Sequence, residues 1–78
     1  MNDFIKNSKQ LGQIIRKRRK EMNLTQKELS DLCNTGNRFI SELENGKGTV
    51  QFEKALRIIN ALGLEIQITN KGFDSWKS

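Results

Sequence analysis

The sequence predicts a compact all-α domain of four helices, followed by one short β-strand near the C-terminus. Two observations support this prediction: apolar residues recur at helical spacing between residues that end helices, and one late stretch alternates strictly. At 78 residues, the chain has room for one small domain. We expect a flexible N-terminal arm (residues 1–8), a helical domain (9–63), the strand (64–69) and a flexible tail (70–78).

The first helix is expected to begin with Ser8 as its N-cap and to continue to about Met22. Its apolar side chains fall on one helical stripe: Leu11, Ile14, Ile15 and Met22. The stripe predicts that one side of this helix lies on the core.

The second half of the first helix is basic. Residues 16–20 are five consecutive cations, and because a helix turns them in several directions, some can reach a phosphate group while others face water. Lys17 and Lys20 suit a purely solubilising role. Arg19 lies close to the apolar stripe, where an ion pair with Glu44 would join the first helix to the third.

Residues 24–47 encode two short helices joined by a tight turn. Thr25 and Glu28 have the spacing of a capping box at the start of the first of these helices. Its core-facing side chains are expected to be Leu29, Leu32 and Cys33. Asn34-Thr35-Gly36 then interrupts the pattern with residues that tolerate non-helical backbone. The pattern predicts helix, turn and helix over residues 25–45.

The second helix of this motif keeps Ile40 and Leu43 for the core and is closed by Asn45-Gly46. Its other side presents four hydrogen-bonding side chains: Asn37, Arg38, Ser41 and Glu42. Such side chains can read base edges, because Arg suits guanine, Asn suits adenine and Glu can accept from cytosine. A solvated helix face is an equally good interpretation of the spacing alone.

A fourth helix is expected over residues 52–62, with Gly63 as its C-cap glycine. The strand that follows places three apolar side chains on one face: Leu64, Ile66 and Ile68. Because a lone strand leaves its backbone groups unpaired, we expect it to pair with the same strand of a second copy across a two-fold axis. An extended segment packed on its own domain is the alternative.

The tail, residues 70–78, is polar but contains Phe73 and Trp76. Trp is frequently an anchor at interfaces, so these two aromatic side chains are candidates for binding a protein partner. An equally good interpretation is that both fold back over the dimer.

Composition narrows the function. The formal net charge of +5 favours a polyanionic partner. The sequence shows no long apolar run and no segment that resembles a signal peptide, so we expect a cytoplasmic protein. The chain has no His and no Tyr, and Cys33 therefore has no imidazole to activate it. We expect no enzyme activity, no catalytic residue, no metal or cofactor and no small-molecule substrate.

Several segments together resemble the lambda-repressor-like (Cro or XRE) helix-turn-helix family. They are Ile15-Arg16, Arg19, Leu24-Thr25-Gln26, Glu28-Leu29, Ile40-Ser41, residues 43–47 and Ala61-Leu62-Gly63. The resemblance implies a domain that binds double-stranded DNA as a dimer, with its third helix in the major groove. Asn37, Arg38, Ser41 and Glu42 fall on the base-reading positions of the family, and Arg19 with Glu44 matches its internal salt bridge.

The resemblance also implies DNA phosphate contacts. Gln26 and Asn45 match phosphate-holding positions of the family, and Lys47 is their neighbour; the cations Arg16 and Lys27 complete the expected set. Two residues depart from the family pattern: Asn34 replaces the usual turn glycine and Thr35 the usual small hydrophobe. Asn tolerates a left-handed backbone, so the turn should survive. Phe39 is bulkier than the common residue, and we expect it to contact DNA instead of the core.

The runs Arg38 to Lys47 and Ala61 to Ile66 resemble the HipB-type antitoxins in particular. That resemblance implies a repressor of a palindrome-like operator that also neutralises a HipA-type Ser/Thr kinase toxin. Two alternatives stay open. The chain could be a phage-type repressor or restriction-modification controller, or a protein-interaction module that no longer reads DNA.

Overall fold

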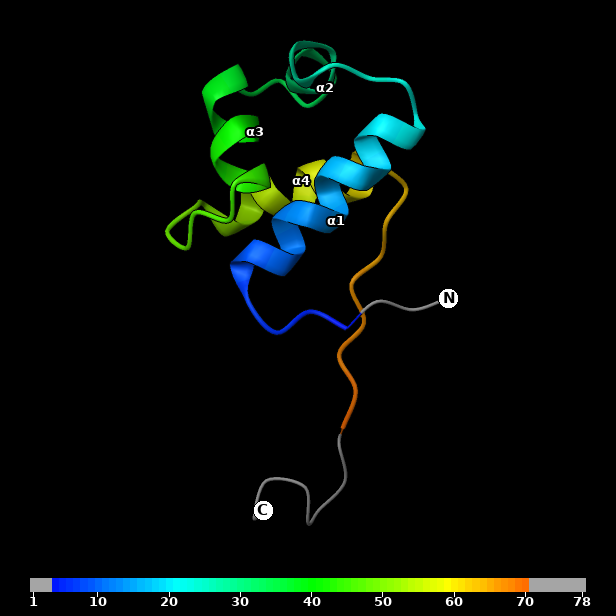
Figure 1. The fold of residues 1–78 in the computed structure, drawn as a ribbon, viewed down its shortest axis with the longest axis vertical. Coiled ribbons are helices and arrows are strands. Elements are labelled where there is room, and N and C mark those ends of the chain that lie inside the picture. Colours follow the sequence, from blue (N-terminus) through cyan, green and yellow to red (C-terminus); the bar gives the residue numbers. More distant parts are fainter. Residues whose placement is uncertain (1–3, 71–78) are drawn as a thin grey trace.

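A computed structural model describes residues 4–70 of the chain (Figure 1). In this range the chain forms α1 (Ser8–Glu21), α2 (Gln26–Leu32), α3 (Asn37–Glu44) and α4 (Phe52–Ala61). In the view of Figure 1, α1 crosses in front of α4, with α3 beside it and α2 above, while residues 64–70 lead away from the helices. The predicted all-α fold of four helices is confirmed. No strand is assigned within residues 4–70, so pairing of residues 64–69 with a second copy stays a prediction.

One hydrophobic core holds the helices together, and both α1 and α2 pack on α3. Its buried side chains are Ile15, Leu29, Cys33, Ile40, Leu43, Ala55, Ile58, Ile59 and Leu62. Two side chains that the apolar patterns assign to the core are instead exposed, Met22 (38%) and Leu32 (68%), and so is Phe52 (69%) at the start of α4. Each stands at or just beyond a helix end, where the apolar stripe has already passed the edge of the core.

The start of α1 differs from the prediction by one residue. Asn7, not Ser8, is the N-cap: its side chain accepts a hydrogen bond from the backbone N–H of Gln10 at 2.8 Å. Ser8 lies inside the helix, and its hydroxyl donates to the carbonyl oxygen of Gly46 at 2.8 Å. Asn and Ser are both good N-cap residues, but here the hydroxyl of Ser8 is used to tie the start of α1 to Gly46, in the turn after α3.

Gly12 brings α1 and α3 into direct backbone contact. A Cβ atom at this position would lie 2.5 Å from the carbonyl oxygens of both Leu43 and Glu44. The missing side chain therefore lets α1 approach the C-terminal end of α3 more closely than any other residue type would allow. This contact fixes where α3 sits on the domain.

Candidate nucleic-acid interface

The predicted capping box is present at the start of α2. The hydroxyl of Thr25 accepts from the backbone N–H of Glu28 at 3.0 Å, and the Glu28 carboxylate accepts from the backbone N–H of Thr25 at 2.9 Å. After α2, Asn34 adopts a φ of 52°, so the left-handed turn forms with Asn in place of glycine. Gly36 is the N-cap of α3, and Gly46 follows its end with a φ of 83°. Helix, turn and helix lie where the sequence places them.

The outer face of α3 carries the four residues predicted to read bases. Ile40 and Leu43 are buried in the core on the opposite side of the helix. Exposure varies along the outer face: Asn37 and Arg38 are exposed, and Ser41 and Glu42 are half-buried. The side chain of Arg38 is 89% exposed.

Glu42 holds two of the neighbouring cations, which sequence reasoning did not indicate. Its Oε2 atom lies 3.0 Å from Nζ of Lys47 and 3.4 Å from Nε of Arg38. The hydrogen bond from Lys47 and the charges of both cations hold the pKa of Glu42 below its ordinary value of 4.5. Glu42 is therefore a carboxylate at neutral pH, able to accept a hydrogen bond but not to donate one.

Behind this face lies the Arg19–Glu44 ion pair that the sequence predicts. Arg19 Nε is 2.6 Å from Glu44 Oε2, and Arg19 Nη2 is 3.0 Å from Oε1, so the contact is bidentate. Only 9% of the Arg19 side chain and 2% of the Glu44 side chain are exposed. The hydrogen bond to Glu44 raises the pKa of Arg19 despite its burial, which keeps the guanidinium charged. Arg19 also donates to the carbonyl oxygen of Leu24 at 2.7 Å, joining α1 to the loop before α2.

The same carboxylate orients Gln26, the first residue of α2. Gln26 donates from Nε2 to Glu44 Oε1 at 3.1 Å. Because a carboxylate only accepts hydrogen bonds, this contact fixes which end of the Gln26 amide faces inward. The side-chain oxygen and the second amide proton are left to face outward, in an orientation set by α1 and α3 together.

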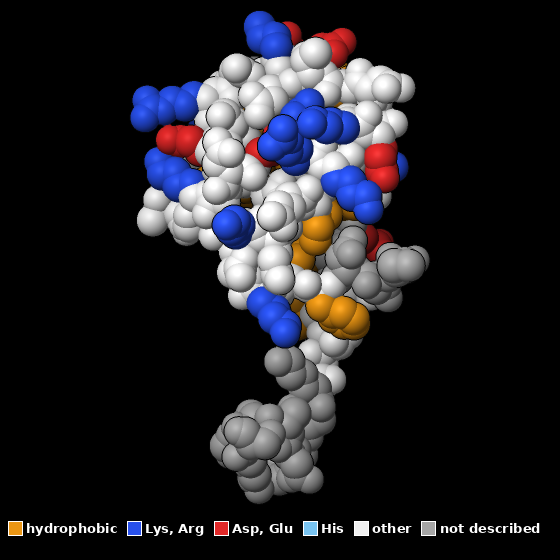
Figure 2. Space-filling model, viewed as in Figure 1, with side chains coloured by type: hydrophobic (Ala, Val, Ile, Leu, Met, Phe, Trp, Pro, Cys, Tyr) orange, Lys and Arg blue, Asp and Glu red, His pale blue; other side chains and the backbone are white. Residues whose placement is uncertain are grey.

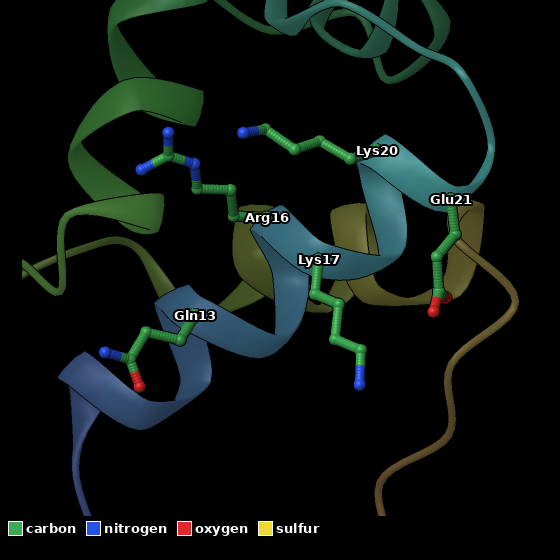
Figure 3. Close-up of a pocket in the computed structure, with 5 residues that line it drawn as sticks. All are labelled: Gln13, Arg16, Lys17, Lys20 and Glu21. Atoms are coloured by element: carbon green, nitrogen blue, oxygen red, sulfur yellow. The ribbon is translucent and has the colours of Figure 1, made fainter.

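The remaining residues predicted to hold phosphates differ in their surroundings. Lys27 pairs with Asp31 along the surface of α2 at 2.8 Å, and Lys47 pairs with Glu42 as described above. Asn45 is the exposed C-cap of α3. Arg16 is exposed on α1, and Figure 3 shows its side chain running toward α3. These side chains thus come from α1, α2 and the end of α3.

Three roles in this region were missed by sequence reasoning. Arg18 donates from Nε to the carbonyl oxygen of Leu62 at 2.8 Å, and so ties α1 to the end of α4. Phe39 was expected to contact DNA instead of the core; it packs partly buried against the core, with Nζ of Lys54 5.7 Å from its ring centre. Gly12 could have been suspected, since a glycine inside a helix is costly unless something needs the space.

A second surface, apolar in character, lies where the chain leaves α4. A groove of about 540 Å³ is bordered by α1, the N-terminal arm and residues 63–69. Its apolar lining consists of Phe4, Ile5, Leu11, Ile14, Ile59, Leu64 and Ile66. Figure 2 shows Lys and Arg side chains grouped in the middle of the face that carries α1, and hydrophobic side chains exposed below them.

The residues predicted to form the strand lie at or beyond this groove. Leu64 is half-buried, whereas Ile66 is 45% exposed and Ile68 is 95% exposed. Phe73 and Trp76, the candidate partner-binding residues of the tail, lie outside the described residues.

Few side chains suited to catalysis or metal binding are present in the part of the chain that the structure describes. The Cys33 side chain is buried, and this burial raises the pKa of its thiol, an effect that nearby Arg57 partly offsets. Residues 4–70 contain no group of three or more His, Cys, Asp or Glu that could hold a metal ion. No helix in this range is long and apolar enough to cross a membrane.

Sequence comparisons match this geometry. A family model described as "Helix-turn-helix" matches residues 15–68. A curated relative, the uncharacterized HTH-type transcriptional regulator y4mF of Sinorhizobium fredii, is 43% identical over 68 residues. The aligned region is 87% of this chain and 90% of that protein.

Solved structures share the fold. This chain is similar to "MDT Protein" with a TM-score of 0.82 and 21% identity, covering 91% of this chain and 100% of that one. The chain in a "HipB-O4 20mer complex" gives the same TM-score, identity and coverage, as does a chain in a "HipA-HipB-O2-O3 complex". At this level of identity the likeness establishes the architecture of the domain.

Proposed function

We propose that this chain is a sequence-specific repressor that binds operator DNA as a homodimer. The premise is its family: the chain belongs to the helix-turn-helix family of XRE, or lambda-repressor-like, transcriptional regulators. The observation that carries the proposal is the outer face of α3. Its four polar side chains are exposed or half-buried, while the opposite side of the same helix is buried and anchored to α1 by an ion pair and a backbone contact.

In this mechanism α3 lies in the major groove. Arg38 suits the O6 and N7 acceptors of a guanine, and Asn37 suits an adenine. Ser41 can bond to either kind of edge, and the ionised Glu42 can accept from the amino group of a cytosine. Glu42 also holds Arg38 and Lys47 before DNA arrives, which limits the freedom that these two side chains must lose on binding.

Phosphate contacts set the register of α3 on the duplex without reading sequence. Gln26 is oriented by the buried Glu44 before any contact with DNA, so its amide is preorganised to donate to a phosphate oxygen. Asn45, Lys47, Lys27 and Arg16 supply the remaining contacts. The ion pair of Arg19 with Glu44 thus serves both the fold and the position of a DNA-contacting side chain.

Two copies are proposed to pair through residues 64–69. Pairing would cover Ile66 and Ile68, whose exposure in a single chain is otherwise unfavourable. Two-fold pairing presents two α3 helices on one side of the duplex, about 34 Å apart, over a palindrome-like operator.

We further propose that the repressor is the antitoxin of a toxin–antitoxin pair. The support is the structural likeness to HipB chains, one of them in a complex with HipA, together with the aromatic tail. The partner would be a HipA-type Ser/Thr kinase, bound through Phe73 and Trp76. If the gene beside this one encodes such a kinase, the full chain should form a stable complex with it that Trp76→Ala weakens. Failure of that complex would remove the antitoxin role and leave the repressor role standing.

The repressor role is tested by titrating the protein with its own upstream promoter duplex and with a scrambled duplex of equal composition. We expect Arg38→Ala to cost about 1–3 kcal/mol on the promoter and much less on the scramble. Lys17→Ala is the matched control, because it removes the same charge from a side chain that points away from α3 (Figure 3). Equal losses on both duplexes for Arg38→Ala would mean that Arg38 reads no base.

A further inference from the structure

Arg16 and Lys20 are one turn apart on α1 and lead into the same space. Figure 3 shows both side chains running from α1 toward α3, with their charged ends on the same side of the helix. Lys17 and Glu21 lead in another direction, away from α3. Within the basic run of residues 16–20, Arg16 and Lys20 thus point toward α3 and Lys17 does not, a difference that composition alone does not reveal.

Neither of these two cations forms an ion pair within residues 4–70. Four other cations near α3 are paired with carboxylates: Lys27 with Asp31, Lys47 and Arg38 with Glu42, and Arg19 with Glu44. Like charges at positions i and i+4 of a helix repel each other and destabilise it by a few tenths of a kcal/mol. Arg16 and Lys20 keep this repulsion, although Arg18 on the same helix pairs with Glu21.

Arg19 fixes the position of this pair relative to α3. It lies between Arg16 and Lys20 in the sequence, faces inward from α1, and is joined to Glu44 at the end of α3 by two hydrogen bonds. Gly12 holds the same two helices in backbone contact. The two cations are therefore carried at a fixed place beside the base-reading helix.

We propose that Arg16 and Lys20 form a two-cation clamp for a single backbone phosphate of DNA, next to the groove that α3 occupies. The proposal rests on the proposed function and assigns Lys20 a binding role that the sequence does not reveal. A phosphodiester removes the repulsion between the two side chains, since it places one negative charge between them. Arg16 provides a planar fork of donors, and Lys20 provides a point charge on a flexible stem.

The salt dependence of binding to the scrambled duplex tests the clamp, because a phosphate contact does not depend on base sequence. Each phosphate that the protein neutralises contributes about 0.9 to the slope of log K against log salt concentration. We expect the double variant Arg16→Gln/Lys20→Gln to lower the slope by about one unit in total, and each single variant to lower it by less than that, since both cations hold one phosphate. Lys17→Gln, a matched loss of charge from a side chain that leads away from α3, should leave the slope unchanged.

Four results would overturn the clamp. The first two are an unchanged slope in the double variant and a fall of about two units, which means two independent phosphates. The third is the full fall in Arg16→Gln with no change in Lys20→Gln, which means that Arg16 alone holds the phosphate, and the fourth is an equal effect of Lys17→Gln. Thermal unfolding of each variant checks that it is folded. Because Lys20→Gln removes the like-charge repulsion with Arg16, we expect its Tm at low salt to equal or slightly exceed that of the wild-type protein.

Titration of the promoter duplex in parallel separates this proposal from the proposed function. If the wild-type protein prefers the promoter but the variants keep its salt slope, the clamp is wrong and the repressor stands. If the slope falls as expected but no preference for the promoter exists, the clamp stands and the repressor is wrong. A wild-type protein that binds neither duplex contradicts both.

Discussion

The contact between α1 and α3 differs from the segment after α4 in how far a single chain completes its packing. At the first, a buried ion pair joins the helices, Gly12 lets the backbones touch, and Gln26 is held in place. At the second, an apolar groove is open, and Ile66 and Ile68 stand 45% and 95% exposed beside it. A single chain thus completes the packing behind the outer face of α3, whereas it leaves the apolar groove beside residues 64–69 open.

This difference separates two kinds of damage. Substitutions between α1 and α3 should destabilise the domain and weaken DNA binding together. Substitutions in residues 64–69 should leave the domain folded and affect only what depends on two copies.

Arg19→Met is expected to have the largest effect. It removes one partner of a buried pair and leaves the Glu44 carboxylate stranded, which typically costs about 3–5 kcal/mol. Lys17→Met, on the exposed side of the same helix, should change stability by less than about 0.5 kcal/mol. Chemical denaturation measures both. Equal stabilities of the two variants would show that the pair does not hold α1 on α3.

Gly12→Ala is expected to cost about 1–3 kcal/mol, because the new methyl group overlaps two carbonyl oxygens of α3 and forces the helices apart. The variant should also lose affinity for the promoter beyond its loss of stability, since α3 moves. Gly48→Ala is the control: its Cβ would meet only the Ser8 hydroxyl, at 3.8 Å. A fully stable Gly12→Ala protein would mean that α1 and α3 are less tightly apposed.

Ile66→Lys is expected to change the stability of the single domain by less than about 1 kcal/mol but to remove the dimer. Because dimerisation couples stability to concentration, the Tm of the wild-type protein should rise with protein concentration, and that of the variant should not. Gln67→Lys adds the same charge to the other face of the proposed strand and should keep the dimer. A dimeric Ile66→Lys protein, seen by sedimentation, would rule out pairing through this face.

The smallest effect concerns Glu42 and pH. Its pKa is lowered in the folded state by Lys47 and Arg38, so the stabilisation it provides is complete above its ordinary pKa and is lost as pH falls through the lowered value. Glu42→Gln should flatten the stability profile slightly in the acid range below the ordinary Glu42 pKa of 4.5. High salt should shrink the difference, since the cluster is on the surface. If the stability of Glu42→Gln fell more steeply with decreasing pH than that of the wild-type protein, the result would contradict the ion pairs of Glu42.

Sequence reasoning predicted those features that depend on neighbours in the chain. The capping box of Thr25 and Glu28, the turn at Asn34 and the faces of α3 follow from spacing and from residue conformational preferences. The ion pair of Arg19 with Glu44 was also predictable, because helical periodicity places Arg19 beside the apolar stripe.

Other features depend on distant segments meeting and could not be read from local patterns. Arg18 bonds to Leu62, which lies 44 positions away, and Ser8 bonds to Gly46, 38 positions away. Phe39 was assigned to the DNA side by comparison with a smaller residue, but the space beside α4 accepts its ring. Periodicity also could not separate Arg16 and Lys20 from Lys17, because their roles depend on where α3 lies.

The most direct test of the central claim is a hydroxyl-radical footprint of the full chain on its own promoter duplex. A dimer with one α3 in each of two successive major grooves predicts two protected stretches on one side of the duplex, about 34 Å apart. Ile66→Lys should weaken both stretches together. Uniform protection along the duplex, or equal protection of a scrambled sequence, would contradict the account and leave only the attraction of a basic protein for DNA.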